Sequence, residues 1–374
     1  MKFKIKSEIL LTNLNYVSRA VSSKNIIPIL SGIMFDLTEE GLNLVASDES
    51  LLIKCNINKE DIEEIKEIGS IVIPGRYILD IIRKLPNNTI TIETDGLKIL
   101  IKSKSGEYNL NGMDSKEFPN YNIELNKHPL IINQKDLSDI ISQASFSCST
   151  QEARPILTGI NIKIENDVLE AVATDSYRLS KKVIKIDNQD NNIDIVIPKL
   201  SLVELKNILN EKDKIELHVF NNKIIFKLKN ILFQSRLLNG TYPSVNSLIP
   251  NEYSIEVTTS LDELYNVIDR TSLLSDGDKN IIQMEVKDNE IITTCFSQQV
   301  GAIEEHIIID QNNQNNFKIA FNSKYMLEAL KSFSGEKVKI GLTSEIKPFI
   351  IKDIEDNSLI QLIVPIRTYW PSIY

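Results

Sequence analysis

Residues 155–179 read PILTGINIKIENDVLEAVATDSYRL, and residues 28–52 read PILSGIMFDLTEEGLNLVASDESLL. The two segments start 127 residues apart and align without a gap, so that an aspartate recurs near their ends as Asp48 and Asp175. A repeat of this length has the size of a domain and is too long for one unit of a solenoid. The copies diverge at their ends, where Ser176-Tyr177-Arg178-Leu179 stands in place of Glu49-Ser50-Leu51-Leu52.

A second segment occurs three times, at intervals of 124 residues. It reads IPGRYILDIIRKL (73–85), IPKLSLVELKNIL (197–209) and FNSKYMLEALKSF (321–333). Each copy has apolar residues at helical spacing, which predicts a helix with one buried face. Alternating strands follow each helix, and Asp95-Gly96 and Asn221-Asn222 are expected to form hairpin turns.

An opening strand and helix also recur, with leucines at the matching positions Leu10, Leu137 and Leu261. Each repeat is thus predicted to be a module of strands and helices, with the helices on one side of the sheets. We expect an α+β fold of three repeated domains, over residues 1–124, 125–251 and 252–374.

The composition is typical of a globular protein: 374 residues, 42% hydrophobic and 25% charged. No apolar run reaches the roughly 18 residues of a membrane span, and the start MKFKIKSEIL does not resemble a signal peptide. We therefore expect a cytoplasmic protein. The net charge of −9 excludes a surface that is basic all over. The polar segments DNQDNN (187–192) and DQNNQNN (310–316) are expected to be loops.

The sequence shows no recognisable catalytic or metal site. It contains no phosphate-binding glycine loop, no His-Glu-x-x-His and no Cys-x-x-Cys. Asp48 and Asp175 each follow an apolar strand, where an aspartate accepts hydrogen bonds from the backbone of a turn. We expect no cofactor, buried thiols at the three cysteines, and ordinary roles for the three histidines: Cys55, Cys148, Cys295, His128, His218 and His306.

The repeated helix carries two cations seven residues apart in each copy: Arg76 and Arg83, Lys199 and Lys206, Lys324 and Lys331. Seven residues is about two turns, so the two members of a pair share a face. An acid accompanies each pair, as Asp80, Glu204 and Glu328. Taken alone, the pattern favours a solvated helix face with ion pairs. Its threefold repetition instead favours contact with a phosphate backbone, independent of base sequence.

The collection MKFKI, PILSGI, VATDSYRL, LLNGTYPSV, FNSKYML and LIVPIRTY, in this order in a three-repeat chain, resembles the bacterial DNA polymerase III beta subunits, the sliding clamps. The resemblance covers essentially the whole chain. It implies a head-to-tail homodimer that closes into a ring, with helices lining the hole and antiparallel sheets outside. Such a ring encircles duplex DNA, performs no chemistry and tethers the replicative polymerase. The cations that would line the hole, here called the cationic set, are Arg19, Lys24, Arg76, Arg83, Lys199, Lys206, Arg270, Lys324 and Lys331.

The resemblance also implies a hydrophobic groove for short peptides from the polymerase alpha subunit, the clamp loader and other replication and repair proteins. The groove set would be Arg154, Leu157, Thr174, Tyr177, Arg178, Leu179, Pro243 and Leu248 from the second domain, with Asn322, Tyr325, Ile346, Leu362, Val364, Pro365, Ile366 and Arg367 from the third. An aromatic and an arginine at a loop corner beside aliphatic residues suit a peptide pocket. The first repeat has Ser50 and Leu51 in place of Tyr177 and Arg178, so it would lack this peptide pocket.

Two departures from the family pattern concern this groove. Ser176-Tyr177 stands where the family often has Gly-His, and WPSIY (370–374) extends past the usual end. The aromatic tail, Trp370 to Tyr374, raises the hypothesis that it folds over the groove, against the alternative that it is inert. The dimer contact implied by the resemblance, here called the interface set, joins Tyr108 and Leu110 to Leu273 and Leu274.

Two other classes of protein compete with the clamp. A repeat-built interaction scaffold would share the groove without encircling DNA. A hydrolase would need a convergent acid–base pair, which the sequence does not show.

Overall fold

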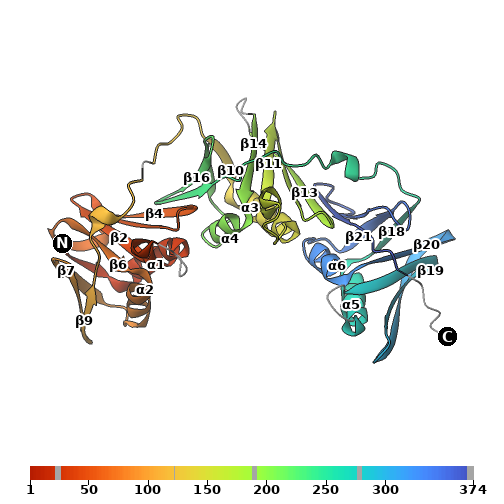
Figure 1. The fold of residues 1–374 in the computed structure, drawn as a ribbon, viewed down its shortest axis with the longest axis horizontal. Coiled ribbons are helices and arrows are strands. Elements are labelled where there is room, and N and C mark those ends of the chain that lie inside the picture. The colour runs from red at the N-terminus through yellow and green to blue at the C-terminus, as the bar shows by residue number, and fades with distance from the viewer. Residues whose placement is uncertain (22–26, 122, 188–191, 276–279, 369–374) are drawn as a thin grey trace. The chain divides into compact units, whose positions relative to one another are not determined.

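The structure, a computed structural model, describes residues 1–21, 27–121, 123–187, 192–275 and 280–368, with the backbone alone for 310–315 (Figure 1). It divides into two compact units, Met1–Lys135 with Ser201–Leu237, and Asp136–Leu200 with Leu238–Tyr374. Two of the boundaries between the two units fall inside helices. One lies after Lys135 in α3 (Gln134–Ala144), and the other lies after Leu200 in α4 (Lys199–Lys206).

The first unit contains two antiparallel sheets, with strand orders β5-β1-β7-β8-β9 and β10-β15-β16-β17-β4-β3-β2-β6. The five-stranded sheet consists of β1 (Lys2–Lys6), β5 (Ile62–Glu67), β7 (Thr89–Asp95), β8 (Lys98–Ser103) and β9 (Gly106–Asn111). The eight-stranded sheet consists of β2 (Gly32–Thr38), β3 (Gly41–Ser47), β4 (Leu51–Asn58), β6 (Gly69–Pro74), β10 (Leu130–Asn133), β15 (Lys214–Val219), β16 (Lys223–Leu228) and β17 (Ile231–Arg236).

Two helices of the first unit, α1 (Ser7–Val17) and α2 (Gly75–Lys84), lie side by side against strands of the eight-stranded sheet (Figure 1). Leu10 of α1 and Ile78 of α2 are fully buried, as the helical spacing predicts. The predicted hairpins are also present, since Asp95-Gly96 joins β7 to β8 and Asn221-Asn222 joins β15 to β16. Gly96 has φ +55°, a conformation that glycine adopts at little cost.

The second unit contains an eight-stranded antiparallel sheet, β14-β11-β12-β13-β23-β22-β21-β18, and the two-stranded sheet β19-β20. The strands are β11 (Gly159–Glu165), β12 (Val168–Thr174), β13 (Arg178–Lys185), β14 (Ile193–Pro198), β18 (Ile255–Ser260), β19 (Ile281–Ser297), β20 (Gly301–Asn322), β21 (Lys337–Leu342), β22 (Phe349–Asp353) and β23 (Leu359–Ile363). Together with the first unit, this confirms the predicted α+β class with antiparallel sheets.

Two helices of the second unit, α5 (Leu261–Thr271) and α6 (Ser323–Leu330), pack against each other (Figure 1). Both have side-chain caps: Ser260 Oγ accepts from Glu263 N–H at 3.3 Å, and Asn322 Oδ1 accepts from Tyr325 N–H at 3.1 Å. Short 3₁₀ turns complete the chain: η1 (Ser18–Ala20), η2 (Pro28–Ser31), η3 (Lys59–Asp61), η4 (Ser115–Glu117), η5 (Ser145–Ser147), η6 (Pro155–Thr158), η7 (Asn246–Leu248) and η8 (Ser272–Leu274).

Each eight-stranded sheet joins neighbouring repeats. β4 of the first repeat pairs with β17 of the second, and β13 of the second pairs with β23 of the third. The middle repeat therefore contributes strands to both large sheets. This topology explains why the compact units do not coincide with the sequence repeats.

The prediction of a loop at 310–316 was wrong, because this backbone lies within β20. β19 and β20 pair along most of their length, with register shifts between Val286 and Glu290 that accommodate the extra residues of β20. Within this segment Asn313 pairs with Asp288 of β19, and this contact in a bulged part of the ladder opposes the low strand propensity of asparagine and glutamine. For the other predicted loop, 187–192, residues 188–191 lie outside the described residues. The three cysteines are buried, as predicted.

Candidate functional site

The turn between β12 and β13 is built on Asp175. Its Oδ1 accepts hydrogen bonds from the backbone N–H groups of Tyr177 at 2.9 Å and Arg178 at 3.0 Å. Ser176, between them, has φ +79°. Thr174 Oγ1 closes the turn by donating to the carbonyl oxygen of Arg178 at 2.6 Å. Asp175 therefore has the turn-forming role that the sequence predicts.

The first repeat contains the same turn. Asp48 Oδ1 accepts from the N–H groups of Ser50 at 3.0 Å and Leu51 at 2.7 Å, and Glu49 has φ +75°. Ser47 Oγ donates to the Leu51 carbonyl at 3.0 Å. The two repeats thus share their backbone here and differ in the side chains that the turn presents.

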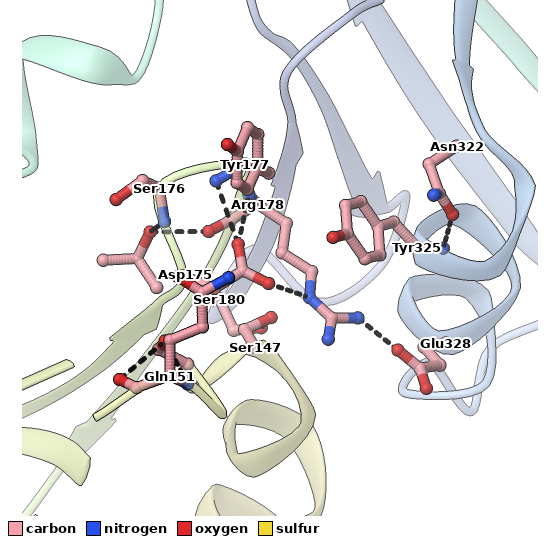
Figure 2. Close-up of polar contacts among 12 residues, drawn as sticks. Ser147, Gln151, Asp175, Ser176, Tyr177, Arg178, Ser180, Asn322, Tyr325 and Glu328 are labelled. Carbon is pink, nitrogen blue, oxygen red and sulfur yellow. Dashed lines mark hydrogen bonds and ion pairs between the residues drawn. The ribbon is translucent and has the colours of Figure 1, made fainter. Parts of the chain in front are cut away.

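The side chain of Arg178 joins this turn to α6 (Figure 2). Its Nε donates to Asp175 Oδ2 at 2.9 Å, and its Nη1 donates to Glu328 Oε2. The guanidinium carbon lies 4.4 Å from the centre of the Tyr325 ring, a cation–π distance. Only 11% of the Arg178 side chain is exposed, so these protein contacts take up most of its charge.

Tyr325 lies in the first turn of α6, directly after the Asn322 cap, and faces Arg178 (Figure 2). Burial, and then the charge of Asp175, raise the pKa of the Tyr325 phenol. The ring is therefore a neutral surface over a wide pH range, and it supports the arginine from one side.

A buried polar network lies next to this corner. Ser180 Oγ donates to Gln361 Oε1 at 2.5 Å and is 2.6 Å from Ser147 Oγ. Gln361 Nε2 donates to the Gln143 carbonyl at 3.0 Å and to Ser332 Oγ at 2.9 Å. These bonds tie β13 and β23 to the end of α3, to η5 and to the segment after α6, which fixes the base of the site.

An apolar cluster forms the other side of the corner. Its buried members are Val172, Leu179, Val245, Ile350 and Leu362, with Val364 packed against them. Two large side chains of the groove set are exposed beside it, Tyr177 at 61% and Leu248 at 49%, since their backbones bond to Val364 and Val245 of the cluster. A third, Ile346, is 60% exposed. Exposed apolar side chains beside an apolar cluster are typical of a surface that binds a partner.

Two cavities include members of the groove set. One of about 440 Å³ lies on β11, β12 and β14 and is bordered by Pro243. Its three carboxylates are already engaged: Glu165 by Lys163 at 2.9 Å, Glu170 by Lys181 at 2.6 Å, and Asp194 by the Asn161 amide at 2.7 Å.

The second cavity, of about 110 Å³, is lined by groove residues at the C-terminal side and by parts of β20. The groove residues in its lining are Ile346, Ile366 and Arg367. Leu157 is buried, Arg154 is exposed before η6, and Pro365 is half-buried after β23.

Sequence reasoning missed two residues of this corner. Asp175 was identified only as a turn former, and Glu328 only as an acid beside two lysines. The recurrence of Asp175 beside a new arginine was a usable signal. No signal in the sequence indicated the contact between Glu328 and Arg178, because this contact depends on which strand pairs with the edge of β13.

The cationic set differs in how much of its charge is compensated. In the first unit Arg19 pairs with Glu204 at 2.9 Å and Arg83 with Asp80 at 3.3 Å. In the second unit Arg270 makes a two-pronged contact with Glu305, at 2.7 and 2.6 Å. Lys331 Nζ lies 5.4 Å from the centre of the Tyr265 ring. Arg76, Lys206 and Lys324 are exposed, Lys199 is half-buried, and Lys24 lies outside the described residues.

The three helix acids therefore have different partners. Asp80 pairs within its own helix, whereas Glu204 and Glu328 reach the distant Arg19 and Arg178. The pattern alone favoured a solvated helix face on which each acid pairs with a cation of its own helix. Among these three described acids, Asp80 of the first repeat is the one that does so.

The interface set lies in two different places. Tyr108 and Leu110 are half-buried on β9, an edge strand of the five-stranded sheet. Leu273 in η8 is 76% exposed, and Leu274 is half-buried beside it. An edge strand offers unpaired backbone groups to another chain.

The remaining candidate groups are the histidines. His218 is buried in β15, where its Nδ1 accepts from Asn126 N–H at 2.9 Å, and His128 is exposed. Exposed His306 lies between Glu290 and Glu304. Among the residues with described placement, no cluster of His, Cys, Asp or Glu could hold a metal ion. In the same part of the chain no helix is long and apolar enough to cross a membrane.

Comparison with known proteins gives matches over nearly the whole chain. Residues 1–122, 131–244 and 246–367 match the N-terminal, central and C-terminal domains of the DNA polymerase III beta subunit. The beta sliding clamp of Staphylococcus aureus is 36% identical over 376 residues, covering 99% of this chain and all of the relative.

Solved structures agree in fold. The DNA polymerase sliding clamp of Bacillus subtilis is 38% identical, with a TM-score of 0.93 over 99% of this chain and all of that one. A sliding clamp of Pseudomonas aeruginosa bound to griselimycin is 23% identical, with a TM-score of 0.93 over 98% of this chain and all of that one. At that identity the likeness shows the fold alone.

Proposed function

The chain belongs to the DNA polymerase III beta subunit family of sliding clamps, and we propose that two copies of it close head to tail into a ring around duplex DNA. As a sliding clamp it is a processivity factor, which keeps the polymerase on its template. The observation that carries this function is the match of three consecutive clamp domains over almost the full chain. The three domains are proposed to span residues 1–124, 125–251 and 252–374.

The ring is proposed to close through the interface set. Edge strand β9, with Tyr108 and Leu110, would meet the η8 region of the second copy, with Leu273 and Leu274. A contact between different surfaces of identical chains gives a ring when the rotation closes. The chain would act in the cytoplasm, associated with the nucleoid.

The cationic set is proposed to face the DNA. Phosphate contacts of this kind give an attraction that is independent of sequence and weakens with salt. Arg76, Lys206 and Lys324 are exposed, whereas Arg19 and Arg83 are already paired with acids. We therefore expect the first three to contribute more to retention on DNA.

The groove set is proposed to bind short peptides from the polymerase alpha subunit, the clamp loader and other replication and repair proteins. The exposed side chains of Tyr177 and Leu248 beside the Leu179–Leu362 cluster, and of Ile346 at the smaller cavity, support this proposal. Griselimycin, the ligand of the Pseudomonas aeruginosa clamp, is proposed to bind here as well. The hypothesis of a tail folded over the groove concerns residues 370–374, which lie outside the described residues.

The test of the ring is topological. Clamp loaded onto nicked circular DNA should remain bound during gel filtration, and should be lost when a nuclease linearises the circle. We also compare two variants for the salt concentration at which they are lost from circular DNA. The triple variant Arg76→Gln, Lys206→Gln and Lys324→Gln should be lost at a lower salt concentration than the double variant Arg19→Gln and Arg83→Gln. Equal loss from circular and linear DNA would support a scaffold that does not encircle DNA.

A further inference from the structure

Glu328 connects the corner around Arg178 to the lysines of α6. It accepts from Arg178 on one side, and it shares its helix with Lys324 and adjoins Lys331. The acids at the matching positions of the other repeats do not reach a groove residue, since Asp80 binds Arg83 and Glu204 binds Arg19. Among the three repeats, it is thus the helix acid of the third, Glu328, that pairs with a residue of the candidate peptide site.

Helix geometry places Glu328 between the two sites. At about 100° per residue, Lys331 lies about 20° to one side of Lys324 around the helix axis, and Glu328 lies about 40° to the other side. Tyr325 lies about 100° from Lys324 in the same direction as Glu328. Glu328 is therefore spaced to pair with Lys324, four residues before it, or with Lys331, three residues after it. In the structure its side chain is instead engaged by Arg178 (Figure 2).

We propose that Glu328 is a positioning residue that couples the peptide groove to DNA contact by pairing either with Arg178 or with the lysines of α6. In the first arrangement, which the structure shows, Arg178 is held against Tyr325 and pairs with Glu328, and Glu328 acts on Lys331 through its charge. In the second arrangement Glu328 pairs with one of the lysines and neutralises its charge. Arg178 then retains its ion pair with Asp175, and its remaining N–H groups can donate to a ligand in the groove. The inference rests on the function proposed above for both surfaces.

The two arrangements favour different ligands. DNA phosphates favour the first, because Glu328 is then paired with Arg178 and leaves more of the charge of Lys324 and Lys331 available to phosphate. A groove ligand that accepts hydrogen bonds from Arg178 favours the second. Linkage requires that each ligand weaken the binding of the other by the same factor. A peptide partner would thereby loosen the contact of its own subunit with DNA, while the closed ring keeps the clamp on the duplex.

The first test removes the competing arginine. Arg178→Met leaves Glu328 to the lysines, so binding of a short labelled duplex should weaken, and the slope of log K against log salt should fall by about one per chain. Adding Glu328→Gln to Arg178→Met should restore the wild-type slope. Arg236→Met, which removes an exposed arginine at the end of β17, serves as the charge control and should leave the slope unchanged. Fluorescence anisotropy over a range of salt concentrations measures each value.

The second test keeps Arg178. Glu328→Gln should raise griselimycin affinity by about fivefold, a typical size for a coupling residue, because Arg178 then has no competing acceptor on α6. Asp80→Asn, which removes an acid from the matching helix, should leave it unchanged. Titration calorimetry on the folded dimer measures both. Because Glu328→Gln retains Arg178, it tests the coupling even if Arg178→Met does not fold.

The outcomes separate this inference from the proposed function. Equal DNA slopes for wild type, Arg178→Met and the double variant, or equal griselimycin affinity for Glu328→Gln and wild type, would overturn the coupling alone. Wild-type protein that binds neither DNA nor griselimycin would overturn the proposed function and the coupling with it.

Discussion

At the scale of single residues, two aspartates in identical turns have different importance. Asp48 accepts from two backbone N–H groups, and the first repeat has Leu51 where the second has Arg178. Asp175 makes the same backbone contacts and also holds the guanidinium. The backbone role is therefore shared, and the side-chain role belongs to the second repeat.

Alanine substitutions should separate these roles. Asp48→Ala should lower the free energy of unfolding by about 1 kcal/mol, the usual cost of losing such a cap. Asp175→Ala should lower it by about 2 kcal/mol, because Arg178 also loses a partner, and should weaken griselimycin binding. Urea denaturation and calorimetry measure the two quantities. Equal griselimycin affinity in both variants would show that the Arg178 contact does not matter for the groove.

His306 gives the molecule a predictable pH response. Its Nδ1 lies 2.9 Å from Glu290 Oε2 and its Nε2 lies 3.3 Å from Glu304 Oε1, and the Glu290 hydrogen bond is the main cause of its raised pKa. Since the folded-state pKa lies above the unfolded value of 6.5, the stabilisation is fully present below about pH 6.5 and is lost as pH rises through the folded value.

The test is His306→Gln. Its free energy of unfolding should fall furthest below that of wild type under about pH 6.5, and the difference should shrink as pH rises from there. Urea titrations at a series of pH values measure the difference. A difference that stays constant with pH would contradict this role of the two glutamates.

The sequence predicts the residue roles that depend on local structure. The turn aspartates and the buried leucines follow from neighbours along the chain, and the buried cysteines from their number and spacing. The Arg178–Glu328 pair could not be predicted, because its members lie 150 residues apart and meet only through the β13–β23 pairing.

At the scale of elements, the two large sheets are each held together by one pair of strands from different repeats. The β13–β23 pair is reinforced by the buried network around Gln361, which is 1% exposed. On the β4–β17 pair, Gln234 Oε1 is buried without a hydrogen-bond partner among the described residues. The hairpins and helices were predictable from periodicity, but these pairings between repeats were not, because strand alternation does not specify the neighbour of an edge strand.

Leucine substitutions at the two glutamines should have opposite outcomes. Gln361→Leu removes the buried hydrogen bonds of Gln361 to Ser180, Ser332 and the Gln143 carbonyl, and should cost about 2–3 kcal/mol of stability. Gln234→Leu removes an unpaired oxygen, and should change stability by less than about 0.5 kcal/mol or increase it. Urea denaturation compares them, and similar losses in both would contradict the assignment of the network.

At the scale of the whole molecule, the proposed ring depends on a contact between unlike ends of two chains. Leu273 is 76% exposed in one chain and, on this proposal, covered by the partner. A large exposed leucine on a short turn fits an interface that is completed only in the dimer.

Removing this contact should give monomers. Leu273→Ala with Leu274→Ala should sediment as a single chain, because the apolar side of the interface is lost. Leu200→Ala on α4, where the leucine is 79% exposed, is the matched control and should remain dimeric. Sedimentation that is unchanged in the double variant would place the interface elsewhere.

The pairing of β4 with β17 also has a consequence for synthesis. β4 is made early, but its neighbour Ile231–Arg236 leaves the ribosome only after most of the middle repeat. During that interval one row of amide and carbonyl groups on β4 has no strand to bind, which is the kind of open edge that invites aggregation. β13 waits in the same way for Leu359–Ile363, almost the last strand residues to emerge. We expect chaperones to meet this nascent chain twice, once for each waiting edge.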